Sequence, residues 1–170
     1  CYENGIKSVG LDISPLAVFI SNAKLTLPHN IDSLRKDFQK IRINGRKPKP
    51  NLIKMEFFKR SFSEENLDKI LRLRQSIYEI ENKINQNFFL LALISILEES
   101  SNIRKHGAHY RFINNDNVGI KGNFQISDPD SAFRNRVERF LQDMKIRKKL
   151  ISTNYSFRNK VYLDDARKLN

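Results

Sequence analysis

The spacing of apolar residues predicts that most of this chain is helical. Apolar side chains recur three and four positions apart, which places them on one face of a helix. The predicted helices span about 15–25, 30–43, 64–84 and 88–97, with a further one that begins near Asp130 or Ser131. The 88–97 segment is apolar nearly all round, as a buried helix would be. We therefore expect a helical hairpin, made of the third and fourth segments, packed against the last helix.

Two short apolar runs predict β-strands, one that ends at Asp12 and one over 161–163. Ser14 and Pro15 then favour the cap and first turn of a helix. Parallel sheets contain such strand-to-helix connections, and they bind ligands beyond the carboxyl ends of their strands, where an acid commonly accepts hydrogen bonds from ribose hydroxyls. Asp12 is therefore a candidate nucleoside-binding residue, although a role in capping the helix would also explain it. The predicted fold class is α/β and mostly helical.

Two polar segments interrupt the predicted helices. Residues 46–50 alternate cations with prolines, which favours an extended, self-repelling connector and the clearest boundary in the chain. Residues 102–130 lack periodicity and predict either a partly mobile loop that faces nucleic acid or a plain disordered connector. Residues 55–62 are expected to form an ordered approach to the helix that Ser63 caps.

Composition narrows the possible partners. The 170 residues suffice for one domain with a core, and the net charge of +12 favours a polyanionic partner, either a phosphate backbone or an anionic membrane surface. The single cysteine, Cys1, excludes an intrachain disulfide and fits the reducing cytoplasm. The longest apolar run, 88–97, is too short to span a bilayer, so no membrane span is expected.

The first residues are typical of an internal piece of a longer protein. The chain begins without methionine, and residues 2–5 resemble the end of a helix with its glycine stop. Two parallel strands alone also make a poor sheet. We therefore expect the remaining strands of the sheet to lie outside this sequence.

The sequence around Asp12 resembles a specific family. Residues 9–17, Val-Gly-Leu-Asp-Ile-Ser-Pro-Leu-Ala, resemble the second strand of S-adenosylmethionine-dependent DNA methyltransferases that modify exocyclic amino groups of adenine or cytosine. Ser14 stands where many members have asparagine. Residues 160–169 resemble the third-strand motif of the same family, usually Gly-Asp-Ala-Arg. Segments 57–67 and 89–97 resemble the helical insert of one branch of these enzymes.

The resemblance implies a binding site for S-adenosyl-L-methionine. Asp12 would accept hydrogen bonds from the ribose hydroxyls, and Ile13 would pack on the adenine face. Asp165 would hold the adenine amino group, with a neighbouring backbone contact from Ala166. Because Asp164 replaces the usual glycine, the acid that binds the amino group could also be this preceding residue.

The sequence contains no candidate catalytic residue. Members of the family hold and stack the flipped base with a polar residue, two prolines and an aromatic residue, and this chain has no adjacent prolines. Asp128 and Pro129 instead predict a helix start. The glycine-rich cofactor loop is also absent, so we expect the chain alone to be inactive. His106 and His109 lack further ligands at suitable spacing, so no metal site is predicted.

Two clusters of cations are candidate nucleic-acid contacts, because lysine and arginine neutralise phosphates and fix register without reading bases. A solvated helix face in a basic protein is the alternative. The candidate residues for DNA binding are Arg42, Arg46, Lys47, Lys49, Arg136 and Arg139.

The sequence thus predicts a segment of a DNA methyltransferase with a partial Rossmann-like core and a large helical insertion. Residues 1–29 and 156–170 would belong to the cofactor domain, and 30–155 would form the insert that contacts DNA. The complete enzyme would transfer methyl from S-adenosylmethionine to an exocyclic amino group, as restriction-modification enzymes do. Three alternatives remain open: an RNA methyltransferase fragment, a non-enzymatic helical nucleic-acid-binding module, and a protein-interaction domain that uses the helical hairpin.

Overall fold

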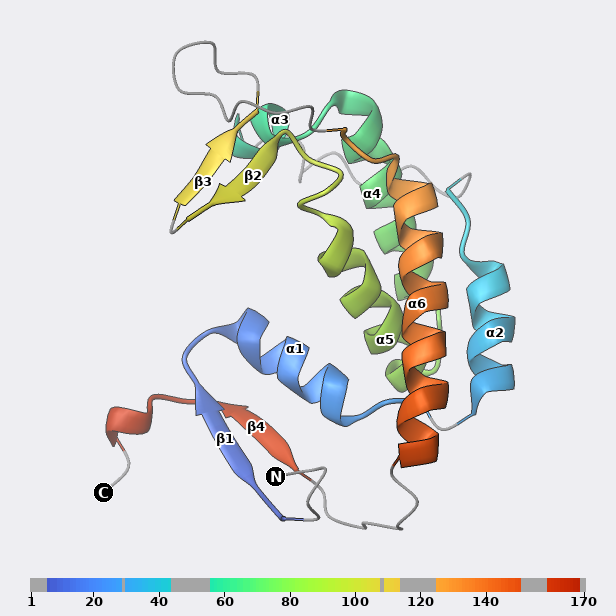
Figure 1. The fold of residues 1–170 in the computed structure, drawn as a ribbon, viewed down its shortest axis with the longest axis vertical. Coiled ribbons are helices and arrows are strands. Elements are labelled where there is room, and N and C mark those ends of the chain that lie inside the picture. The colour runs from blue at the N-terminus through green and yellow to red at the C-terminus, as the bar shows by residue number, and fades with distance from the viewer. Residues whose placement is uncertain are drawn as a thin grey trace.

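The fold is a helical body with two small sheets at opposite ends of its long axis (Figure 1). The computed structural model describes residues 6–28, 30–43, 56–107, 109–113, 125–150 and 159–168. Within these ranges the helices are α1 (Pro15–Leu25), α2 (Ile31–Lys40), α3 (Glu56–Ser61), α4 (Glu64–Tyr78), α5 (Lys83–Ile96) and α6 (Pro129–Leu150). The strands are β1 (Val9–Asp12), β2 (Ile103–His106), β3 (His109–Phe112) and β4 (Lys160–Leu163), and a short 3-10 helix follows at Ala166–Lys168. The prediction of a mostly helical α/β chain is confirmed.

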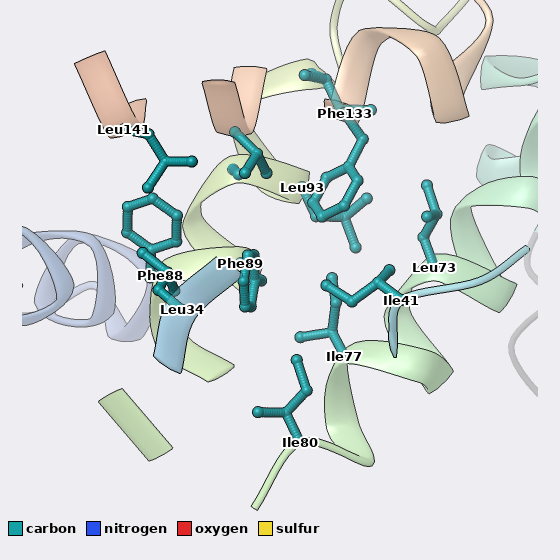
Figure 2. Close-up of a cluster of buried hydrophobic side chains, with 13 residues drawn as sticks. Leu34, Ile41, Leu73, Ile77, Ile80, Phe88, Phe89, Leu93, Phe133 and Leu141 are labelled. Atoms are coloured by element: carbon teal, nitrogen blue, oxygen red, sulfur yellow. The ribbon is translucent and has the colours of Figure 1, made fainter. Parts of the chain in front are cut away.

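The core lies among α2, α4, α5 and α6, and Figure 2 shows its side chains. Phe89 is fully buried and meets Phe88 edge to face, with 5.4 Å between the ring centroids. Phe38 of α2 stacks on Phe89, with 6.0 Å between the ring centroids. Phe133 of α6 contacts the same Phe38 ring edge to face. The expected hairpin of helices packed against a third helix is confirmed, and α2 completes the core.

Local capping sets the helix starts. Ser14 Oγ accepts a hydrogen bond from the Ala17 amide at 3.3 Å, and Asn30 Oδ1 accepts one from the Ser33 amide at 2.9 Å. Each bond satisfies an amide that lacks a partner within its helix. Asn30, and not the alternative Asp32, therefore caps α2, which ends at Lys40.

The predicted gap between the helices at 64–84 and 88–97 is wrong, because residues 85–87 lie inside α5. The helix is capped by Asn82, whose Oδ1 accepts from the amides of Ile84 and Asn85. Asn85 is buried, and its Nδ2 donates to Asp37 at 2.8 Å. Gln86 Nε2 lies 3.0 to 3.4 Å from three carbonyl oxygens at the end of α4, those of Ile77, Tyr78 and Ile80. Buried polar groups are accommodated in an apolar helix when such partners exist.

The predictions for 55–62 and 102–130 also need correction. Residues 56–61 form the helix α3, where only an ordered approach was expected. Part of the supposed structureless loop forms an antiparallel hairpin, β2–β3, which projects from the top of the body in Figure 1. The hairpin closes at Gly107, whose φ of +61° suits glycine. None of the described helices is long and apolar enough to cross a membrane.

Candidate functional site

The two end segments of the described chain form one parallel sheet. β1 pairs with β4 in a register that sets Asp12 opposite Leu163, although about 150 residues separate them. Hydrogen bonds at the two ends of this ladder fix its geometry: the Lys160 amide donates to the Ser8 carbonyl at 3.4 Å, and the Asp164 amide donates to the Asp12 carbonyl at 3.1 Å. The expectation of neighbouring parallel strands is confirmed. The segments that follow Asp12 and Leu163 therefore leave the sheet at the same, carboxyl edge.

Asp12 participates in the turn that links β1 to α1. Its Oδ1 accepts a hydrogen bond from the Ser14 amide at 2.8 Å, and Ser14 in turn caps the helix. In the described part of the chain Oδ2 has no hydrogen-bond partner. Asp12 therefore supports the helix start and still offers a carboxylate oxygen at the edge where ligands of parallel sheets bind. The two interpretations of this residue are compatible.

Ile13 lies between the strand and the cap, and its side chain is 69% exposed. An exposed branched aliphatic side chain next to a carboxylate provides apolar surface against which a flat ring could pack. This is the position that the resemblance assigns to adenine packing. Nothing in the described residues covers it.

Asp165 is held by Arg167. The guanidinium donates to both carboxylate oxygens at 2.7 to 3.1 Å, and the Arg167 amide donates to Oδ1 at 3.0 Å. These hydrogen bonds keep the pKa of Asp165 below its usual value, so the carboxylate stays ionised and accepts hydrogen bonds. Arg167 is 84% exposed, whereas the Asp165 side chain is 19% exposed. A ligand amino group would therefore share or displace the arginine, which is free to swing into solvent.

The neighbours of Asp165 define its position. Asp164 Oδ1 accepts a hydrogen bond from the Asp165 amide at 2.8 Å, and Ala166 begins the 3-10 helix. Sequence analysis did not identify Arg167 as a partner of the acid. The signal was present, since an arginine two residues after an aspartate can return to its carboxylate in a tight turn.

The two outer edges of the sheet differ. On the β4 side, Asn22 of α1 donates to the Val161 carbonyl at 2.7 Å and accepts the Val161 amide at 3.0 Å. On the β1 side, Val9 and Leu11 direct their amides and carbonyls away from β4, because hydrogen-bonding direction alternates along a strand. These groups have no partner among the described residues. The outer edge of β4 is thus covered at Val161, whereas none of the described residues covers the outer edge of β1.

The predicted DNA-contacting cations fall in different places. Arg42 is exposed just after α2, where its amide donates to Ser76 Oγ. Arg136 and Arg139, both on α6, line a polar cavity of about 310 Å3, in which Arg136 pairs with Glu99 at 3.0 Å. The other three predicted cations, Arg46, Lys47 and Lys49, lie outside the described residues.

His106 and His109 are opposite each other at the end of the hairpin. Among the described residues, no group of three or more histidine, cysteine, aspartate or glutamate side chains is placed to hold a metal ion.

A second concavity is an apolar groove of about 540 Å3 between α1 and the α3–α4–α5 unit. Leu16 and Phe19 form its α1 wall, and Phe58 of α3 and Ile94 of α5 lie on the other side. Of its described lining residues only Arg74 is charged. The groove provides apolar surface but no group suited to recognise a nucleoside.

No protein-family model, curated protein or solved structure matches the chain.

Proposed function

We propose that this chain is a segment of an S-adenosylmethionine-dependent DNA methyltransferase that modifies an exocyclic amino group. The observation that supports the proposal is the parallel pairing of β1 with β4. This pairing joins the two segments that carry the family's motifs, and both motifs end at the same edge of the sheet.

In this proposal the edge binds the nucleoside part of the cofactor. Asp12 accepts hydrogen bonds from the ribose hydroxyls through the oxygen that the Ser14 amide leaves free. Ile13 packs on the adenine ring, and the ionised Asp165 accepts a hydrogen bond from the amino group, with Ala166 beside it. The cofactor supplies the methyl group, and these residues only orient it.

The open edge of β1 fits the same proposal. The outward amides and carbonyls of Val9 and Leu11 are suited to pair with a further strand, since parallel strands normally have neighbours on both sides. Residues 1–29 and 156–170 would then belong to a Rossmann-like cofactor domain, and 30–155 would be its helical insert. The catalytic residues would be supplied from outside this chain.

Chemical-shift mapping tests the proposal on the chain itself. S-adenosylhomocysteine at millimolar concentration should shift the backbone signals of 12–15 and 163–167 and few others. Asp12→Asn and Asp165→Asn should weaken this response, whereas Asp143→Asn, an exposed change on α6, should not. Asp164→Asn separates the two possible assignments of the adenine-binding acid. Shifts confined to the apolar groove, or none at the highest soluble ligand concentration, would refute the proposal.

A non-enzymatic nucleic-acid-binding module is the second candidate. It is favoured by the exposed cations that lie away from the parallel sheet, on α3, the β2–β3 hairpin and α6. The same titration distinguishes the two candidates. A module of this kind would bind DNA or RNA but would show no response to S-adenosylhomocysteine at the edge of the β1–β4 sheet.

A further inference from the structure

The β2–β3 hairpin has a composition unlike the rest of the molecule. Its eight strand residues, Ile-Arg-Lys-His and His-Tyr-Arg-Phe, include three permanent cations and no acid. Tyr110 is 68% exposed, one of the largest exposures of an aromatic side chain in the described chain. The hairpin projects from the helical body on the end opposite the parallel sheet (Figure 1). Clustered cations beside an exposed aromatic ring are a typical composition for a surface that binds nucleic acid.

The pairing register separates the hairpin residues onto two faces. Directly opposed residues share a face, so Lys105 lies with Tyr110 and Arg104 lies with Arg111. Successive pairs alternate between the faces. The exposed cations Lys105 and Arg111 therefore project from opposite faces of the ribbon.

Arg104 has a structural role in the hairpin, whereas the other two cations remain available for binding. Its guanidinium donates to the carbonyls of Ser101 and Ile103, both at 2.8 Å, and to those of Glu98, Glu99 and Gln125. These contacts fasten the hairpin to the end of α5. The side chains of Lys105 and Arg111, in contrast, have no ion-pair partner among the described residues. The nearest acid in the hydrogen-bond network is Glu98, which accepts the Lys105 backbone amide.

Further contacts fix the base of the hairpin to α3. The Asn102 amide donates to the Ser61 carbonyl at 2.7 Å, and the Ile113 amide donates back to the Asn102 carbonyl at 2.8 Å. The Arg60 guanidinium lies over the Phe112 ring, 4.9 Å from its centroid. An isolated two-stranded hairpin is only marginally stable in water. These attachments explain how this one can project as an ordered element, and they add the cation of Arg60 to its surface.

We propose that the β2–β3 hairpin enters the major groove of duplex DNA. This groove admits a two-stranded ribbon and is bordered by a phosphate backbone on each side. Lys105 and Arg111, which project from opposite faces, contact the two backbones, and Tyr110, on the same face as Lys105, packs against the base edges next to that backbone. A membrane or an acidic protein surface would engage only one face and leave the other cation unused. The inference extends the proposed function but rests on the hairpin alone.

The central experiment compares two charge reversals of equal size. Lys105→Glu with Arg111→Glu is expected to weaken binding to a duplex oligonucleotide at least about tenfold and to reduce the slope of log Kd against log salt by about 2. The control, Lys7→Glu with Lys36→Glu, reverses two exposed lysines that lie outside the hairpin, one just before β1 and one on α2. It should change the affinity by less than about threefold, since long-range attraction is screened at physiological salt. Equal losses in both variants would overturn the proposal in favour of attraction by net charge.

A second variant separates base contact from phosphate contact. Tyr110→Ala should weaken duplex binding several-fold and leave the salt slope unchanged, because no phosphate contact is lost. It removes no described hydrogen bond, so the variant should keep its fold, which circular dichroism checks. Tighter binding to single-stranded DNA or RNA than to the duplex would overturn the groove assignment, as would binding to phosphatidylserine vesicles with the same sensitivity to Lys105 and Arg111. None of the hairpin variants should change the response to S-adenosylhomocysteine. The test of DNA binding by the hairpin is therefore separate from the test of the proposed cofactor site.

Discussion

The side chain of Asn22 hydrogen-bonds both backbone groups of Val161, as amide donor at 2.7 Å and as acceptor at 3.0 Å. A residue in a helix thus takes the place of a neighbouring strand along β4. Exposed sheet edges invite pairing with other chains, and native proteins often cover them. Here the cover is one amide side chain, 139 residues away from its partner in sequence. A further strand is thereby hindered from pairing with β4 at Val161, and β1 has no such cover among the described residues.

Replacement of Asn22 should uncover the β4 edge. Asn22→Leu removes the donor and the acceptor at similar volume and is expected to destabilise the chain by about 1–3 kcal/mol, the cost of leaving polar groups unpaired. Asn22→Asp retains the oxygen that accepts the hydrogen bond from the Val161 amide. The Val161 amide should therefore stay better protected from hydrogen exchange in this variant than in Asn22→Leu. Amide hydrogen exchange at Val161 measures both effects. Unchanged exchange in the leucine variant would show that the side chain does not protect this edge.

Gly10 should be coupled to Val161, its partner across the sheet. A Cβ built on Gly10 would lie 3.1 Å from Val161 Cγ2, closer than ordinary van der Waals contact. Gly10→Val should therefore destabilise the chain by about 1–3 kcal/mol, as overpacking does. In a Val161→Ala background the same change should cost less, because the opposing methyl groups are gone. A double-mutant cycle from urea unfolding measures the coupling, and additive free energies of unfolding would contradict it.

Much of the fold follows from local sequence. Ser14, Asn30 and Ser63 cap helices through amides three residues further on, so their role follows from neighbouring residues. The apolar spacing of α4 and α6 likewise identifies the faces that pack in the core. Such features need no knowledge of distant contacts.

The errors arose where the deciding partner is distant in sequence or carries a weak local signal. Asn85 and Gln86 looked like a break because Asp37 and the carbonyls at the end of α4 cannot be seen as their partners from sequence. The hairpin does carry a local signal, since Gly107 and the residue after it separate two four-residue strands, but its charged residues gave no apolar alternation. In the candidate site the position of Asp12 followed from its place at the end of a predicted strand. The contact between Arg167 and Asp165 was missed because an arginine two residues after an aspartate is only a weak local signal.

Removal of Arg167 should change the titration of Asp165. The guanidinium and amide of Arg167 lower the pKa of this carboxyl, with the side chain as the main cause. Arg167→Ala is therefore expected to raise the pKa of Asp165 towards the usual 3.8. An NMR titration that follows the carboxyl carbon chemical shift from about pH 2 to about pH 6, in steps of about one pH unit, would detect the change. Arg167→Lys should restore part of the depression, and an unchanged midpoint in the alanine variant would exclude the contact.

Asp37 should make the stability of the helical body sensitive to acid. Burial raises its pKa, but the hydrogen bonds from Lys40 at 2.7 Å and Asn85 at 2.8 Å outweigh this effect, so the pKa lies below the usual 3.8. A carboxyl whose folded pKa is lowered stabilises the fold above its unfolded pKa, and this contribution is lost as the pH falls through the folded value. Asp37→Asn keeps an oxygen that can accept the Asn85 amide but cannot be ionised. The variant should be less stable than the parent at pH 7, and the difference should shrink below about pH 4.

Urea unfolding at pH 7 and at about pH 3 tests this expectation. Asp143→Asn, on the exposed side of α6, is the matched control. The control should change the free energy of unfolding by less than about 0.5 kcal/mol at either pH, as exposed substitutions usually do. Asp128 provides an internal comparison, because the hydrogen bond from Lys69 and the Ser131 amide also lower its pKa. The Asp37 variant should therefore retain part of the acid sensitivity of the parent. A difference between parent and Asp37→Asn that stays constant from pH 7 to pH 3 would mean that this carboxylate contributes no charge-dependent stability.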